Sequence, residues 1–268
     1  SGPLPEDRYD ELPGPFYQLL RLVETETEPF RQVHRLIDAV EWAVKWHTTL
    51  ALSDLLSETD LPAEVKVLLA HGLRTPSLGL WNKFFRKSLD ALEDPSLPWR
   101  SWERLTALEE KHNLVNFRNE YAHGATPPPE ECREAVGTYL PVLKEMVHTP
   151  IFTDVGLAIR GEGADPQLLR GSERQALGIE IEGGHAAALL PDLDLNGEAP
   201  GERPWTERAQ LDLWPLGLTA TASMEHSGDA DGDGEERPQF FYFNALKNEA
   251  VERLNYEEAL LGRGPSLY

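Results

Sequence analysis

Apolar residues in the first half of the chain recur every three or four positions, a spacing that predicts helices. The longest run extends from Phe30 to Leu55 and predicts one long helix with a continuous buried stripe, flanked by Trp42 and Trp46. Shorter runs predict further helices over residues 63–73, 78–92, 102–124 and 130–147. We therefore expect an antiparallel bundle of about five helices.

Beyond Pro150 the apolar residues form short alternating or β-rich runs bounded by Gly, Pro, Asp and Asn, which predicts strands. These runs lie at residues 155–159, 176–181, 209–216, 239–244 and 251–256. Their number and spacing favour a small antiparallel sheet or a partly closed barrel. The expected fold class is α+β, with a helical bundle over residues 1–149, whose first 14 residues form an extended tail, and a β-rich domain over residues 150–268.

The chain carries 46 Asp and Glu against 25 Lys and Arg, a formal net charge of −21. Non-specific affinity for nucleic acid comes mainly from Lys and Arg that neutralise phosphates, so most of this surface would repel it. Any contact with RNA must be local. No apolar run approaches the roughly 20 residues of a membrane helix, and the first residues do not resemble a signal peptide. We expect a cytoplasmic protein without a membrane partner, and the start at Ser1 indicates a fragment of a larger protein.

The sequence predicts no metal or cofactor site. The single cysteine, Cys132, lies on an apolar helical stripe and is expected in the core. The eight histidines offer no zinc-binding spacing, and no phosphate loop or dinucleotide fingerprint is present. Residues 229–234 copy the first half of a calcium loop, but its twelfth position is Phe240 rather than glutamate. The acidic segment over residues 223–236 is therefore expected to be a solvated hairpin loop.

The segment Arg118-Asn119-Glu120-Tyr121-Ala122-His123-Gly124 is the one candidate for chemistry. Asn119 and His123 lie one helical turn apart on one face, and the long Arg118 side chain can reach the same spot. This group can bind a phosphate, because Arg is always charged and His titrates near neutral pH. It can equally close a helix at Gly124, with Asn119 and His123 bonded to free carbonyls and Arg118 paired with Glu120 or an acid from another helix.

Arg118-Asn119 followed by His123 in a helical domain resembles the Arg-x4-6-His signature of the HEPN superfamily, over roughly residues 15 to 149. The tyrosine that marks the toxin-type subgroup, two residues after the histidine, is Ala125 here. Active HEPN members are metal-independent ribonucleases whose dimers form one composite cleft. The resemblance implies that His123 acts as general acid or base, that Arg118 stabilises the charged phosphorane and that Asn119 orients the phosphate.

Two hypotheses follow for the function. The first is a non-enzymatic sensor or interaction module of a bacterial signalling or defence protein, because the chain is acidic and its second half presents no catalytic constellation. Its partners would be another protein, the remainder of a larger multidomain protein, or a second copy joined through the bundle. The second is a dimeric HEPN ribonuclease that uses Arg118, Asn119 and His123, with RNA as its partner.

Overall fold

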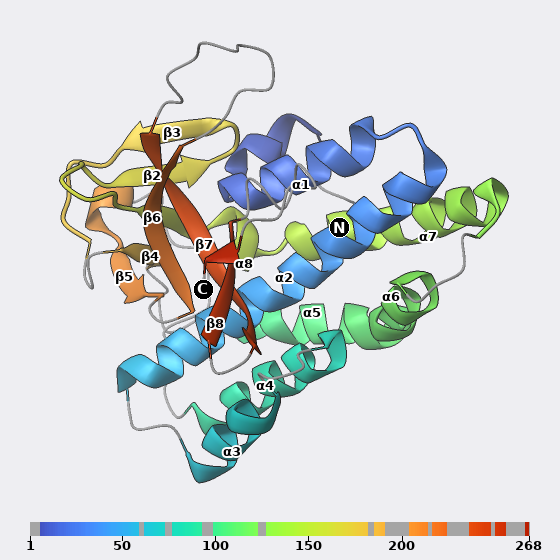
Figure 1. Ribbon diagram of the computed structural model, residues 1–268, viewed down its shortest axis with the longest axis horizontal. Coiled ribbons are helices and arrows are strands. Elements are labelled where there is room, and N and C mark those ends of the chain that lie inside the picture. Colours follow the sequence, from blue (N-terminus) through green and yellow to red (C-terminus); the bar gives the residue numbers. More distant parts are fainter. Residues whose placement is uncertain are drawn as a thin grey trace.

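The protein is an α+β structure with helices in the first part of the chain and two antiparallel sheets in the second (Figure 1). The computed structural model describes residues 6–58, 62–72, 77–92, 99–122, 127–181, 185–190, 204–213, 216–223, 236–247, 250–255 and 266–267. The fold class agrees with the sequence pattern.

Helix α2 is the centre of the bundle, and α1, α4 and α7 pack along it. The helices in the described part of the chain are α1 (Gly14–Thr25), α2 (Pro29–Glu58), α3 (Ala63–Gly72), α4 (Leu78–Ala91), α5 (Trp99–His112), α6 (Leu114–Ala122), α7 (Pro129–Val147) and α8 (Pro150–Thr153). The stripe predicted for α2 is buried from Val33 to Leu55, as are Trp42 and Trp46 beside it. Burial of this stripe holds the bundle together, because apolar area removed from water is the main favourable contribution to folding.

Two features of the helical part differ from the prediction. The single helix expected over residues 102–124 is two helices, because Asn113 between α5 and α6 has a positive φ of 48°. Asparagine is one of the few residues that adopt this left-handed conformation readily. The expected N-terminal tail also differs, since residues Glu6–Glu11 form the 3-10 helix η1. Tyr9 of η1 and Leu12, which follows η1, are buried. The Leu12 carbonyl accepts a hydrogen bond from Gly171 N at 2.8 Å.

The second part of the chain forms two sheets rather than one. The five-stranded sheet has the order β3-β2-β1-β4-β5 and contains β1 (Gly156–Ile159), β2 (Gln167–Arg170), β3 (Glu173–Ala176), β4 (Ala186–Leu190) and β5 (Ala209–Asp212). A short 3-10 helix, η2 (Trp205–Glu207), precedes β5. The four-stranded sheet has the order β6-β7-β8-β9, with β6 (Gly217–Ser223), β7 (Glu236–Lys247), β8 (Ala250–Asn255) and β9 (Ser266–Leu267).

The strand pattern was predicted only in part. The runs at 155–159, 209–216, 239–244 and 251–256 overlap β1, β5, β7 and β8, but residues 177–181 are not a strand, because β3 ends at Ala176. Strands β2, β4, β6 and β9 were not predicted, and β3 overlaps the predicted run only at Ala176. Strand β4 has the sequence AAALL and is buried at every position, so it has neither β-rich composition nor alternation.

One hydrophobic core extends from the helices into both sheets. Phe16 of α1 packs edge-on against Phe152 of α8 with ring centroids 4.5 Å apart. The rings of Trp42 of α2 and Phe240 of β7 pack edge-on with their centroids 6.4 Å apart. The buried cluster includes Leu157 and Ile159 of β1, while the opposite face of this sheet buries a separate small cluster around Leu168 and Leu189. The apolar packing therefore crosses the boundary predicted between residues 149 and 150.

Candidate functional site

Arg118, the cation of the predicted motif, is held by a carboxylate from another helix. Leu114 and Phe117 are buried and fix α6 against the bundle, and the Phe117 ring stacks on Tyr139 of α7 at 3.9 Å. This places Arg118 beside α2, where its Nε donates to Glu41 Oε1 at 2.6 Å. The two side chains are 22% and 24% exposed, respectively, so the pair is largely screened from water.

The surroundings of this ion pair add further interactions. Arg118 Nη1 also donates to Asn119 Oδ1 at 3.3 Å. The second oxygen of Glu41 lies 4.0 Å from Lys45 Nζ, and Lys45 Nζ in turn lies 6.0 Å from the centre of the Trp81 ring. Glu41 therefore contacts two cations. This arrangement agrees with the structural interpretation of the segment, in which Arg118 pairs with an acid of another helix.

The structure brings Arg118 and Asn119 together, and Asn119 is exposed. His123 and Gly124 lie outside the described residues, so the third member of the motif is not placed relative to the other two. The two other basic residues near the motif in sequence, Lys111 and Arg133, are exposed, and Arg133 pairs with Glu130 at 3.4 Å. Among the described residues, Glu41 is the carboxylate that contacts Arg118, and it also contacts Lys45.

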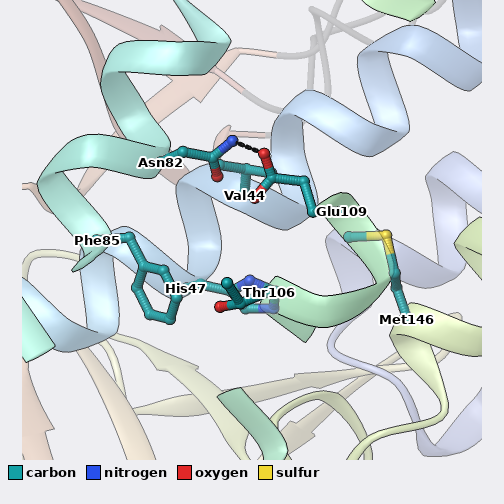
Figure 2. A pocket seen from close by; sticks show the side chains of 7 residues that line it. All are labelled: Val44, His47, Asn82, Phe85, Thr106, Glu109 and Met146. Atoms are coloured by element: carbon teal, nitrogen blue, oxygen red, sulfur yellow. Dashed lines mark hydrogen bonds between the residues drawn. The ribbon is translucent and has the colours of Figure 1, made fainter. Parts of the chain in front are cut away.

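A small cavity inside the bundle gathers polar groups that no sequence motif indicated. Figure 2 shows His47 of α2, Asn82 of α4 and Glu109 of α5 around it, with the Asn82 amide donating to the Glu109 carboxylate. Its lining comprises Val44, His47, Asn82, Phe85, Thr106, Glu109 and Met146. The cavity has a volume of about 10 Å³ that the centre of a water molecule can occupy, which is room for roughly one water molecule.

Burial shifts the pKa values of the two ionisable groups of this cavity, Glu109 and His47, in opposite directions. It raises the pKa of Glu109 to about 7, with Arg86 partly opposing the shift and Glu110 adding to it. It lowers the pKa of His47 to about 3, because the imidazolium form is desolvated among apolar rings. Phe85 and Phe152 lie 5.9 and 5.0 Å from the imidazole centre. Burial thus disfavours the charged form of both side chains, so the cavity favours a neutral histidine and a neutral carboxyl.

The remaining candidates from the sequence have simpler outcomes. Cys132 is buried, as predicted, and burial raises the pKa of its thiol. The calcium-like residues 229–234 lie outside the described part of the chain, although Ser223 and Glu236 are paired where β6 ends and β7 begins. No group of metal-binding side chains occurs among the described residues. None of the described helices is long and apolar enough to cross a membrane.

Comparisons with protein-family models, with curated proteins and with solved structures gave no match for this chain.

Proposed function

We propose that this chain is a non-enzymatic sensor or interaction module of a bacterial signalling or defence protein, built on a HEPN-like bundle joined to a β-rich part. It acts in the cytoplasm through a protein partner, through the remainder of a larger protein, or through a second copy bound at the bundle. The proposal concerns the role of the Arg118 motif, which closes and fixes α6 instead of binding RNA.

The Arg118–Glu41 pair is the observation that supports this proposal. A phosphate bound at the Nε edge of Arg118 would have to displace a carboxylate that lies 2.6 Å from this nitrogen, with most of the pair out of water. Breaking a largely buried pair leaves one charge uncompensated, which is costly. Arg118 Nη1 also donates to Asn119 Oδ1, which ties these two side chains to each other. The Nε and Nη1 donors of Arg118 are therefore engaged with the protein itself.

The alternative is a dimeric, metal-independent HEPN ribonuclease that uses Arg118, Asn119 and His123. The exposed Asn119 beside Arg118 favours it, because a surface amide next to a guanidinium is a suitable start for a phosphate site. Under this alternative, RNA would have to compete with Glu41 for the guanidinium.

An RNA-cleavage assay in EDTA separates the two functions. The intact chain would be incubated with single-stranded and structured RNA beside His123→Ala and Glu41→Gln, with Glu110→Gln as a matched surface control. We expect background cleavage from all four proteins, because Arg118 has a structural role. Cleavage by the intact chain that leaves cyclic phosphate ends and is lost in His123→Ala would establish the ribonuclease. Cleavage by Glu41→Gln alone would show that Glu41 blocks a competent site, which also contradicts the proposal.

A further inference from the structure

Three aromatic rings meet where α6 packs against α7. The Phe117 ring of α6 stacks on Tyr139 of α7 with the centroids 3.9 Å apart, and the Phe117 and Tyr121 centroids lie 5.5 Å apart. Phe117 is buried, whereas Tyr121 and Tyr139 are half-buried and reach the surface. In Figure 1, α6 and the adjoining part of α7 lie at the end of the helical part away from both sheets. The two tyrosines thus give this junction an aromatic surface.

Two carboxylates without ion-pair partners accompany the rings. Glu120 directly precedes Tyr121 on α6, and Glu131 lies in the first turn of α7. Both side chains are exposed. Arg118 is not available to Glu120, because its Nε pairs with Glu41 at 2.6 Å. Within the described part of the chain, neither Glu120 nor Glu131 forms an ion pair or a side-chain hydrogen bond.

The two carboxylates are close enough to the tyrosines to act on their hydroxyl groups. Burial raises the pKa of Tyr121, and the charges of Glu120 and Glu131 raise it further. Burial also raises the pKa of Tyr139, with Glu120 adding to the shift. Among the described residues, the hydroxyls of Tyr121 and Tyr139 have no hydrogen-bond partner. These four side chains form the α6–α7 surface, which is aromatic and negatively charged.

The charge of the α6–α7 surface decides which occupant it fits. A second copy of the chain would bring further negative charge, because the chain has 46 acidic residues against 25 basic ones. RNA is disfavoured for the same reason. A basic protein segment is complementary. Arginine is the best match among the basic residues, because a guanidinium stacks on an aromatic ring by its face and offers paired N–H donors to a carboxylate at its edge.

We propose that the α6–α7 surface binds an arginine-bearing segment of a partner protein. Arginine side chains lie on the rings of Tyr121 and Tyr139, and their N–H groups donate to Glu120 and Glu131. This inference rests on the proposed function, since it names the chemistry of the partner that the interaction module recognises. It also gives a role to Glu120, the residue of the predicted motif that the Arg118–Glu41 pair leaves without a partner.

Fluorescence anisotropy at constant ionic strength tests the α6–α7 surface. The intact chain would be titrated against a fluorescent amphipathic peptide of Arg, Leu and Ala, and against two peptides with Lys or Gln in place of every Arg. The variants are Glu120→Gln, Glu131→Gln, Tyr121→Leu, Tyr121→Phe and the combination of the first three. The matched control is Glu162→Gln, which removes another exposed carboxylate without an ion pair among the described residues, between β1 and β2.

We expect one arginine peptide to bind per chain. Each of Glu120→Gln, Glu131→Gln and Tyr121→Leu should weaken binding about threefold, and their combination by about tenfold or more, because each removes one exposed contact. Tyr121→Phe keeps the ring and should bind like the parent chain, as should Glu162→Gln. The lysine peptide should bind more weakly than the arginine peptide, and the glutamine peptide should not bind.

Five results would overturn this surface. Absence of saturable binding of the arginine peptide would leave it without the proposed ligand. An equal loss in Glu162→Gln would mean that the peptide responds only to net charge. Unchanged binding in Tyr121→Leu would show that the rings do not take part. A dimer in sedimentation that the combined variant abolishes would make a second copy the occupant, and RNA binding that Tyr121→Leu abolishes would make RNA the ligand.

The outcome is distinguishable from failure of the proposed function. RNA cleavage by the intact chain would remove the proposed function, whereas absent peptide binding with background cleavage would remove only the α6–α7 surface. Far-ultraviolet circular dichroism would establish that each variant is folded. If Tyr121→Leu does not fold, the exposed Glu120→Gln and Glu131→Gln variants still decide against Glu162→Gln, because equal binding by all three would overturn the surface.

Discussion

At the scale of single residues, burial in one cavity makes an acid harder to ionise and a base harder to protonate. The raised pKa of Glu109, about 7, and the lowered pKa of His47, about 3, share this cause. Neither residue belongs to a motif, because the cavity draws on four helices that are distant in sequence. The signal available was weak: His47 is a histidine within the apolar stripe of α2. Likewise, Glu41 lies 77 residues before its partner Arg118, and no spacing rule connects them.

Glu109 should make folding stability depend on pH near neutrality. Its folded pKa of about 7 lies above the ordinary value of 4.5 for a glutamate. Its contribution to folding stability is therefore fully present below pH 4.5 and is lost as pH rises through 7. Glu109→Gln keeps an acceptor for Asn82 without the charge. We expect this variant to be more stable than the parent chain by about 1–2 kcal/mol at pH 8.5, after allowance for partial solvent screening, and by less at pH 5.5. Denaturant unfolding at both values measures the difference.

The informative quantity is the difference in free energy of unfolding between the variant and the parent chain, because the titration of His47 changes stability with pH in the opposite direction to that of Glu109. The lowered pKa of His47 removes stability as pH falls below about 6.5, and this contribution is common to both proteins. Glu180→Gln, at a side chain that is 83% exposed and lies in the second part of the chain away from this cavity, serves as control and should not alter the pH profile. An equal gain from Glu109→Gln at pH 5.5 and 8.5 would contradict a neutral-pH titration.

At the scale of elements, the sequence predicted long amphipathic helices better than short strands. The period of α2 persists over 30 residues, whereas β4 has five buried residues and three of them are alanine. A strand of this kind is defined by its neighbours, since β1 and β5 supply its hydrogen bonds on either side. The break between α5 and α6 was also not predicted, because one asparagine in a helical run carries little information without its φ angle.

Asn113 offers a test of the α5–α6 break. Its φ of 48° should make Asn113→Ala destabilising by about 1 kcal/mol and Asn113→Gly nearly neutral, because alanine disfavours the left-handed region and glycine does not. Asn116, exposed within α6, should show the reverse order, since glycine inside a helix costs about 1 kcal/mol relative to alanine. Thermal unfolding of the four variants measures both orders. If alanine were better than glycine at both positions, residue 113 would be part of a continuous helix.

At the scale of the whole molecule, the change from helical to strand pattern does not coincide with a gap in the packing. Ile151 and Phe152 of α8 are fully buried, and the Ile151 carbonyl accepts a hydrogen bond from Trp46 Nε1 at 3.4 Å. In Figure 1 the strands lie against one end of the helical part, next to α2 and α8. Periodicity locates the change of secondary structure, but which residues share a core depends on contacts between distant segments. The domain boundary at residue 149 therefore remains a prediction.

Truncation tests that boundary. A fragment of residues 1–149 loses the apolar cover that α8 gives to Phe16 and Trp46, whereas a fragment of residues 1–155 keeps it. We expect the intact chain to have the highest thermal midpoint, the 1–155 fragment an intermediate one and the 1–149 fragment the lowest, each followed by circular dichroism. In the intact chain, Phe152→Ala should cost about 3–5 kcal/mol, because the cavity that it leaves lies in the shared core. A 1–149 fragment as stable as the intact chain, together with a mild Phe152→Ala, would show that the helices and the sheets fold as separate units.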